Sequence, residues 1–167
     1  MEFQKIEGSL IIEENIFEDI RGSFGRMFDD RRYKDVVFEG VKNINVSKNI
    51  SEGTFRGLHM QVNSYSETKI VFCSKGSIID LFIDCRKDSS TFGSINKVKL
   101  NSEKNQTLLV PRGCLHSFIT LEDNTEVIYM TDNYYSPDNE ISVSPFSNEI
   151  LDPLFLSLDQ CCIKVVG

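Results

Sequence analysis

Short apolar segments separated by turn residues run through most of this chain and constrain its fold more than any other feature. Lys69 to Cys73 reads KIVFC, and a second segment, Ile78 to Asp84, follows the turn at residues 74–77. In the second segment acidic or aromatic residues alternate with isoleucine and leucine, and a period of two is typical of a β-strand. Further strands are predicted at Lys97 to Leu100, Thr107 to Val110, Ser117 to Leu121 and Glu126 to Thr131. Turn-forming clusters separate the strands at intervals of about 8–12 residues, a spacing that indicates an all-β sandwich or barrel.

Helical signals are sparse in this sequence. Asp29 to Tyr33 is predicted to form a turn or two, and the stretch after Asp152 has no clear helical or strand pattern. We therefore expect one all-β domain over residues 1–167, folded as an antiparallel double-sheet jelly roll with a few short helices. Such a fold leaves a hollow between its sheets, in which side chains from several strands can converge.

Composition narrows the possible partners and the compartment. A net charge of −7 and a pI near 4.9 argue against nucleic acid, because binding a phosphate backbone requires a basic face. The amino terminus lacks a signal-peptide pattern, and no apolar run approaches the roughly 18 residues of a membrane span. We therefore expect a cytoplasmic protein without a membrane partner, whose five cysteines are reduced.

The chain has only two histidines, and each lies among glycine and apolar residues. His59 lies in the segment RGLHMQ, residues 56–61, and His116 in PRGCLH, residues 111–116. Imidazole changes its charge near neutral pH, which suits a general base, although the local sequence alone leaves a structural role equally open. His59, Lys69, His116 and Tyr129 lie on different predicted strands or strand ends, so all four can meet in one cavity. Cys114, two residues before His116, is interpreted as a buried thiol rather than a nucleophile, because free cysteine is among the most buried residue types.

An ordered set of motifs resembles the dTDP-4-dehydrorhamnose 3,5-epimerase family, which has a cupin-type jelly roll. The matching pieces are Phe17 to Phe24, Asn45 to Ser47, Gly53 to Gln61, Lys69, Gly76 to Asp80, Asp84 to Arg86, Ser90 to Gly93, Pro111 to His116, Tyr129, Tyr134 to Pro137, and Glu140. The most specific element is Arg-Gly-Leu-His-x-Gln followed by a lysine ten residues after its histidine.

The resemblance implies an enzyme that epimerises C3, C5 or both in a nucleotide sugar with a ketone at C4, in deoxysugar and surface-polysaccharide biosynthesis. Hydrogens at C3 and C5 are both α to that ketone, and removal of one leaves an enolate with negative charge on O4. The reaction needs a base, a cation or donor near O4, and an acid on the opposite face of the ring. By resemblance, His59 is the base, Tyr129 is the acid, Lys69 lies near the oxyanion or the sugar, and His116 binds substrate.

An aspartate near the C-terminus orients the base in this family. The segment LSLD, residues 156–159, resembles the family's Leu-Ser-x-x-Asp at that place, so Asp159 is the expected partner of His59. Asp84 is the alternative partner if His59 faces that strand, and a solvated surface acid is the other interpretation of Asp159.

Cationic residues are interpreted as a diphosphate clamp. Arg21 and Arg56 match family positions that bind the nucleotide sugar, and guanidinium forks suit phosphate oxygens. For Arg21, a surface ion pair with Asp19 or Asp29 is the competing interpretation. The predicted substrate-binding residues are Arg21, Arg26, Asn45, Arg56, Gln61, His116 and Tyr135.

Two departures from the family pattern affect the nucleotide-sugar site. Arg26 stands where the family usually has glutamate, and the segment NIN, residues 43–45, replaces Gln-Asp-Asn. An added arginine beside a diphosphate is favourable, so these changes leave the nucleotide and the sugar open rather than the reaction type.

No metal or other cofactor is expected. Gln61 lies two residues after His59, and two histidines 57 residues apart supply too few nitrogen ligands for a metal-dependent cupin oxygenase.

A sugar-nucleotide 3,4-ketoisomerase and a non-catalytic nucleotide-sugar-binding module compete with the epimerase as functions for this fold. Tyr129 favours epimerisation, because inversion requires an acid opposite the base. The expected partners are a nucleotide-diphosphate sugar and a second copy of the chain in a homodimer.

Overall fold

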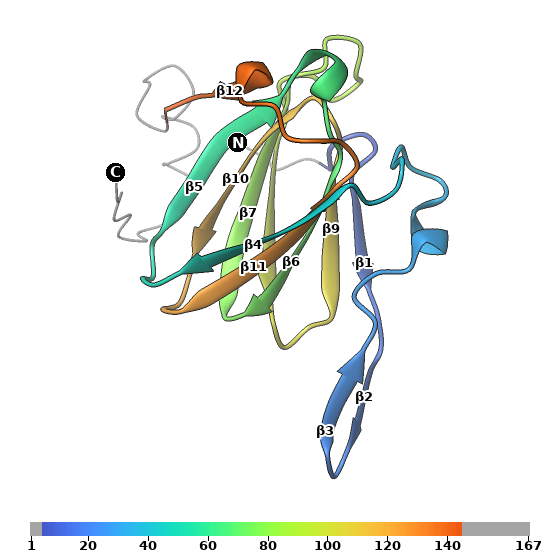
Figure 1. The fold of residues 1–167 in the computed structure, drawn as a ribbon, viewed down its shortest axis with the longest axis vertical. Coiled ribbons are helices and arrows are strands. Elements are labelled where there is room, and N and C mark those ends of the chain that lie inside the picture. Colours follow the sequence, from blue (N-terminus) through green and yellow to red (C-terminus); the bar gives the residue numbers. More distant parts are fainter. Residues whose placement is uncertain (1–4, 145–167) are drawn as a thin grey trace.

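Two five-stranded sheets lie face to face in the computed structural model, which describes residues 5–144 (Figure 1). The first sheet contains, in spatial order, β1 (Leu10–Glu13), β9 (Gln106–Val110), β6 (Lys69–Lys75), β11 (Thr125–Thr131) and β4 (Asn43–Asn49). The second contains β12 (Glu140–Ser142), β5 (Phe55–Gln61), β10 (Cys114–Thr120), β7 (Ser77–Asp84) and β8 (Ile95–Asn101). Their neighbouring strands are antiparallel. The predicted all-β double-sheet jelly roll is confirmed.

The chain changes sheet at nearly every connection between β4 and β11. β4, β6, β9 and β11 belong to the first sheet, whereas β5, β7, β8 and β10 belong to the second, so that only β7 and β8 follow each other within one sheet. Strands that are consecutive in the sequence, such as β5 and β6 or β10 and β11, therefore belong to different sheets.

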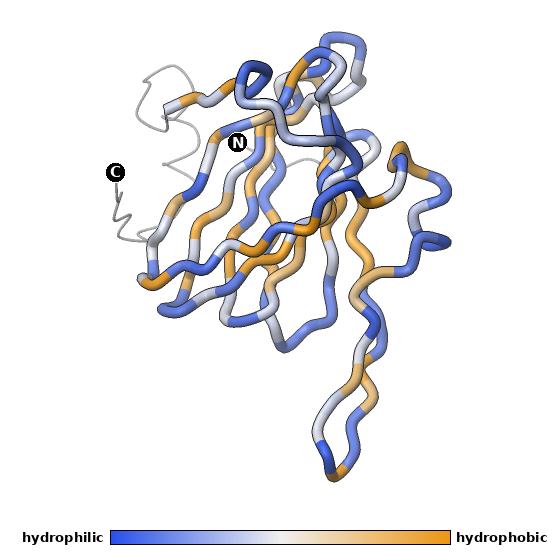
Figure 2. Tube along the Cα trace, in the orientation of Figure 1, coloured by the Kyte–Doolittle hydropathy of each residue, from blue (hydrophilic) through white to orange (hydrophobic). Residues whose placement is uncertain are grey.

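The main core fills the space between the sheets. It contains residues from both sheets: Ile6, Val71, Cys73, Ile78, Phe82, Leu100, Leu108, Val110, Cys114, Phe118 and Val127. Because successive side chains of a strand point to opposite faces, Ile78 and Phe82 of β7 point inward, whereas Leu81 packs in a cluster on the outer face. Apolar residues are concentrated in the strands, and the connections are mostly hydrophilic (Figure 2).

The outer face of the first sheet is covered by the segment that follows β3. Tyr33, at the end of the 3-10 helix η1 (Asp30–Tyr33), packs with Phe28 and Phe38 and with Ile70 of β6. Its hydroxyl lies 2.6 Å from the hydroxyl of Thr107 on β9. Burial of aromatic surface and this hydrogen bond hold the segment on the sheet. The helix also confirms the predicted turn at residues 29–33.

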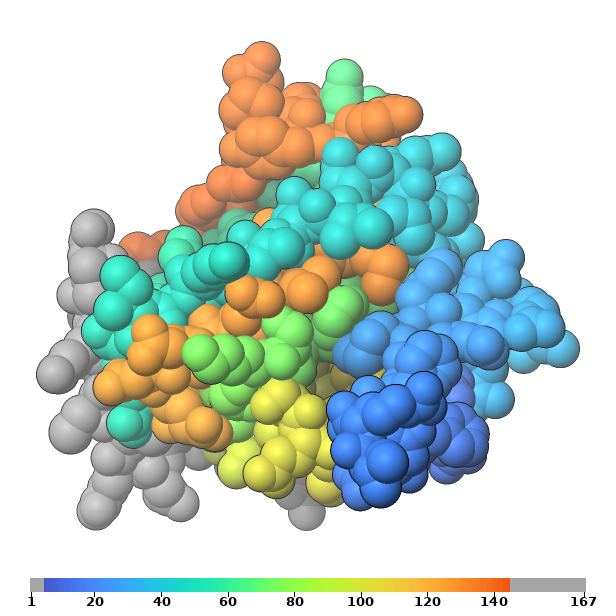
Figure 3. Space-filling model, turned by 60° about the horizontal axis from the view of Figure 1, so that its bottom comes forward, coloured from blue at the N-terminus to red at the C-terminus, as the bar shows by residue number. Residues whose placement is uncertain are grey.

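A hairpin of β2 (Ile16–Asp19) and β3 (Gly22–Gly25) projects from the body of the molecule (Figure 1). From the end toward which it points, the hairpin is a distinct blue lobe on the surface (Figure 3). All eight strand residues are exposed, among them Phe17 at 67% and Phe24 at 69%. An exposed pair of aromatic rings on a projecting element indicates an interaction surface.

The predicted strands from Lys69 to Thr131 are confirmed, whereas several others were missed. β1, β2, β3, β4 and β12 were not predicted. β5 was expected only as a strand or strand end at His59, without bounds, and β10 begins at Cys114 rather than at Ser117. Two further 3-10 helices, η2 (Asn63–Tyr65) and η3 (Pro137–Asn139), complete the described elements. The stretch after Asp152 and the end of the proposed 1–167 domain lie outside the described residues. No helix within residues 5–144 is long and apolar enough to cross a membrane.

Candidate active site

Residues of five strands and of two connecting segments line one cavity of about 320 Å³. Its lining residues are Asn43 and Asn45 of β4, His59 of β5, Glu67, Lys69 of β6, Tyr129 and Thr131 of β11, Tyr135, and Glu140 of β12. An adjoining cavity of about 530 Å³ also includes His59, Tyr129 and Glu140 among its lining residues. Three residues predicted from different strands, His59, Lys69 and Tyr129, are therefore brought together.

A close approach of β5 to β10 positions His59. Gly57 of β5 has a φ of +119°, and a Cβ built on it would lie 2.5 Å from the carbonyl oxygen of His116. Only glycine fits this backbone conformation at this separation. Two residues further along, His59 is opposite His116 in the strand register, and their ring centroids lie 6.2 Å apart.

His116 forms a buried pair with Asp80 of β7. Its Nε2 lies 2.8 Å from Oδ2 of Asp80, and the two side chains are 5% and 0% exposed. Oδ1 of Asp80 has no hydrogen-bond partner among the described residues. His116 does not line either cavity around His59. His116 is thus paired with the aspartate of the neighbouring strand, and its predicted contact with substrate stays a prediction.

Burial and neighbouring charge keep the His59 imidazole neutral. Burial lowers the pKa of His59, and the ammonium of Lys69 and the imidazole of His116 lower it further, to about 3. A ring nitrogen with a free lone pair is therefore available at neutral pH, as a general base requires. Among residues 5–144 no side chain forms a hydrogen bond with this ring.

Lys69 and Tyr129 complete the electrostatics of the cavity. Burial lowers the pKa of Lys69, which is 5% exposed, whereas the carboxylate of Glu67 opposes that effect. Burial raises the pKa of Tyr129, and Glu67 raises it further, so the phenol keeps its proton at neutral pH. The cavity thus holds a neutral base and a protonated acid on facing sheets.

Of the two predicted acidic partners of His59, only Asp84 is among the described residues. Asp159 lies outside the described residues. The carboxylate of Asp84 accepts hydrogen bonds from Arg86 at 2.8 Å, Ser89 at 2.6 Å and Thr91 at 2.7 Å. Asp84 therefore organises the loop after β7, and the alternative pairing with His59 is wrong for this chain.

The predicted substrate-binding residues fall into three groups. Asn45 and Tyr135 line the smaller cavity, and Arg56 lines the larger one, where its Nε donates to Asn49 Oδ1 at 2.8 Å. The second group, Gln61 and His116, is buried and lines neither cavity. The third group, Arg21 and Arg26, is on the hairpin or just beyond it.

Gln61 is part of the scaffold rather than of the cavity wall. It is 3% exposed, and its Nε2 donates to Glu67 Oε2 at 3.1 Å and to the carbonyl oxygen of Tyr134 at 3.1 Å. Its Oε1 accepts from the amide of Ser136 at 2.6 Å. Both ends of the amide are committed to protein groups, and the predicted contact of Gln61 with substrate stays a prediction.

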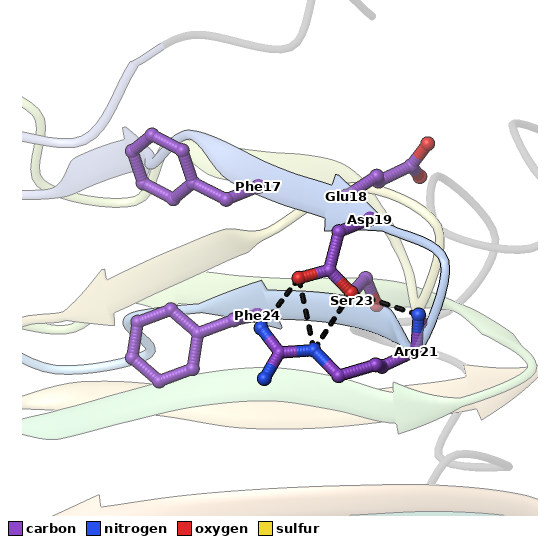
Figure 4. A pocket seen from close by; sticks show the side chains of 7 residues that line it. Phe17, Glu18, Asp19, Arg21, Ser23 and Phe24 are labelled. Atoms are coloured by element: carbon purple, nitrogen blue, oxygen red, sulfur yellow. Dashed lines mark hydrogen bonds and ion pairs between the residues drawn. The ribbon is translucent and has the colours of Figure 1, made fainter.

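Arg21 and Arg26 do not reach the cavity of their own chain. Arg21 folds back on Asp19, with an ion pair of 2.6 Å, and lines a separate hollow with Phe17 and Phe24 (Figure 4). Arg26 is ion-paired with Asp29 at 3.3 Å and is exposed. Within one chain, the surface ion pair that competed with the clamp interpretation describes Arg21.

Residues 5–144 contain no group of three or more His, Cys, Asp or Glu side chains placed to hold a metal ion. The residues that sequence reasoning missed are Asp80, Glu67 and Glu140. Asp80 and Glu140 lay within matched motifs without an assigned role, whereas nothing in the sequence pattern marked Glu67.

The double-sheet jelly roll is the fold of cupin-type proteins. Its cavity holds a neutral imidazole and a protonated phenol on facing sheets, which are the groups that proton transfer requires. The model of the dTDP-4-dehydrorhamnose 3,5-epimerase family matches residues 4–152. The chain belongs to this family of isomerases.

Individual relatives agree with the family assignment. The dTDP-4-dehydrorhamnose 3,5-epimerase of Shigella flexneri is 37% identical over 138 residues, which cover 81% of this chain and 76% of that protein. A crystal structure of the Bacillus anthracis enzyme, with TDP and PPi bound, is 34% identical with a TM-score of 0.80 and 87% of each chain covered. ChmJ, a 3'-monoepimerase from Streptomyces bikiniensis in complex with dTDP-quinovose, is 27% identical with a TM-score of 0.84, covering 100% of this chain and 82% of its own.

The depressed pKa of His59 predicts how stability depends on pH. Below its ordinary pKa of about 6.5, the unfolded chain protonates this histidine, whereas the folded chain does so only near 3. Stability is therefore lost as the pH falls from 6.5 toward 3, by at most about 1.4 kcal/mol per pH unit. Urea unfolding of the wild type and of His59→Asn between pH 7.5 and 4.5 measures this slope. The wild type should lose more stability on acidification than the variant, and parallel profiles would contradict a neutral buried His59.

Proposed function

We propose that this chain epimerises C3, C5 or both of a dTDP-linked 4-keto-6-deoxy sugar. The observation that carries the proposal is the pairing of His59, a neutral base, with Tyr129, a protonated acid, on facing sheets around one cavity. The named activities of the Shigella, Bacillus and Streptomyces relatives support the substrate class.

In the proposed mechanism, His59 removes a proton α to the C4 ketone. The electrons of the broken C–H bond form the enolate, and the negative charge on O4 is stabilised by the ammonium of Lys69. Tyr129 then donates its proton to the same carbon from the other face, which inverts the configuration. Proton exchange with solvent returns His59 and Tyr129 to their starting states. Asp159 remains our proposed orienting partner of His59.

The larger cavity suits the nucleotide diphosphate. Arg56 lines it and is exposed, and its guanidinium has hydrogen-bonding groups beyond the one that Asn49 accepts. Asn45 and Tyr135 line the smaller cavity, where they suit the sugar and the end of the nucleotide. His59 and Tyr129 belong to both cavities, which puts the reacting carbons at their junction.

Two variants separate proton removal from inversion. His59→Asn should abolish both deuterium incorporation and epimerisation, because loss of a general base costs on the order of 10²–10⁴-fold. Tyr129→Phe should keep incorporation at C3 or C5 while epimerised product falls sharply, because the enolate forms but is reprotonated from the side it left. The measurement is NMR of the sugar after incubation in deuterated water, with wild type as the reference.

The same experiment has outcomes that oppose the proposal. A folded His59→Asn protein that exchanges at the wild-type rate would remove His59 from its role. Normal product formation by Tyr129→Phe would show that the phenol is a packing residue. Exchange at C3 alone in the wild type would restrict the enzyme to one carbon and leave the mechanism intact.

We also propose that the chain acts in the cytoplasm as a homodimer in which the hairpin of one copy enters the nucleotide site of the other. The resemblance assigns Arg21 to the nucleotide sugar, whereas within one chain this residue lies on a projecting hairpin away from His59. Exposed Phe17 and Phe24 flank it and offer apolar area to a second copy. A second copy reconciles these facts, because it brings a hairpin to a site that its own chain cannot reach. The same arrangement carries Arg26 toward the diphosphate.

Hybrid dimers test this arrangement. Arg21→Ala and His59→Asn homodimers should each be impaired, with kcat/KM lowered about tenfold or more for Arg21→Ala through loss of a charge-assisted contact. Co-expression with two tags isolates the hybrid. If Arg21 acts in the partner's site, one of the two hybrid sites has both wild-type residues and activity returns. A hybrid with no more than half the activity of the Arg21→Ala homodimer, or a monomer by light scattering, would contradict the proposal.

Activity should survive exhaustive chelation. His59, Lys69 and Tyr129 supply base, oxyanion charge and acid, and the amide of Gln61 is already committed to four protein groups. The measurement is turnover after prolonged treatment with a strong chelator. Activity that disappears and returns with one divalent metal would overturn the mechanism.

A further inference from the structure

Glu67 is a buried acid in the cavity that the proposed mechanism does not use. It lies between η2 and β6, lines the cavity with His59 and Tyr129, and its side chain is 10% exposed. A carboxylate is seldom buried without a partner, because desolvation of the charge is costly. Its neighbours therefore indicate what it does.

Both oxygens of Glu67 are directed at defined groups. Oε1 lies 3.5 Å from Nζ of Lys69, and Oε2 accepts a hydrogen bond from Nε2 of Gln61 at 3.1 Å. Gln61 is itself fixed by the carbonyl oxygen of Tyr134 and the amide of Ser136. The carboxylate is thus anchored to the scaffold on one side and holds the ammonium on the other.

The ammonium of Lys69 faces groups from several elements. Besides Glu67, the charges of Asp80 on β7 and Glu140 on β12 act on it. Its own charge acts on His59 of β5, and Tyr129 of β11 lines the same cavity. Burial lowers the pKa of Lys69, and Glu67 is the largest influence that raises it, ahead of Asp80 and Glu140. Since the Lys69 charge also lowers the pKa of His59, Glu67 affects the base through the lysine.

We propose that Glu67 is a positioning residue that keeps Lys69 charged and aimed into the cavity, and this rests on the proposed function of Lys69 as the group that stabilises the enolate. Glu67 itself does not contact the reacting atoms, because a carboxylate beside an enolate oxygen would repel it. Its action passes through the ammonium. Three residues therefore form a chain of contacts, in which Gln61 positions Glu67 and Glu67 positions Lys69.

The test is Glu67→Gln, which preserves shape and removes the charge. The value of kcat should fall on the order of tenfold while KM stays close to wild type, and the alkaline limb of the kcat profile should move about one pH unit lower. The sign follows from the ion pair: without the carboxylate, Lys69 loses its proton at lower pH. Glu67→Asp, which retains the charge, should keep the wild-type position of that limb. Glu14→Gln, which removes an acid paired with Arg32 outside the cavity, is the matched control and should behave as wild type.

A second measurement does not depend on turnover. The Lys69 ammonium titrates in carbon-13 NMR of labelled lysine, assigned with Lys69→Met, and its pKa should be about one unit lower in Glu67→Gln. Unchanged titration together with an unchanged alkaline limb would overturn the role of Glu67, whereas the wild-type protein would still epimerise. An inactive wild type would instead overturn the proposed function, and the lysine titration would still decide whether Glu67 sustains the charge.

Discussion

A buried ammonium at Lys69 determines the electrostatics on which the rest of the cavity depends. Burial disfavours its charge, and three acids, Glu67, Asp80 and Glu140, oppose that effect. Burial is the main cause that lowers the pKa of His59, and the charge of Lys69 lowers it further, so that the imidazole is neutral and can accept a proton. In the proposed mechanism, the same charge stabilises the enolate oxygen. Lys69 thus acts both on the base and on the oxyanion.

The alternation of the chain between two sheets supplies the geometry. His59 and Lys69 lie on successive strands, β5 and β6, yet belong to different sheets, and His116 and Tyr129 are related in the same way on β10 and β11. Residues from facing sheets can approach a ring from opposite sides, as inversion requires. The tight contact at Gly57 then sets how closely the two histidine strands lie.

Much of the fold could be predicted because β6, β7 and β11 carry continuous or alternating apolar residues. β4 was missed although polar and apolar residues alternate in it, because the alternation is the reverse of that in a core strand. Asn43, Asn45 and Ser47 line the cavities, whereas the apolar Ile44 and Val46 are exposed. β2 and β3 are exposed on both faces, so their sequences show no alternation between a buried apolar face and an exposed polar face.

The candidate site was predicted only in part, because motifs mark single residues but not the residues that they contact. Motifs identified His59, Lys69 and Tyr129, whereas the pairing of Asp80 with His116 depends on cross-strand neighbours that a single sequence does not reveal. Gln61 was assigned to substrate because its motif position is known but its hydrogen-bond partners, in segments up to 75 residues away, are not. In the proposed dimer, the role of Arg21 depends on a second copy of the chain, which the sequence pattern of one chain does not reveal.

In the proposed mechanism, His59 and Tyr129 lie on opposite faces of the sugar ring. A crystal structure of His59→Asn with a dTDP-linked 4-keto-6-deoxy sugar tests it most directly, because the variant binds substrate without consuming it. We expect the ring between residue 59 and Tyr129, one on each face, with O4 directed at the Lys69 ammonium. A ring with both residues on the same face, or with O4 directed away from Lys69, would contradict the account.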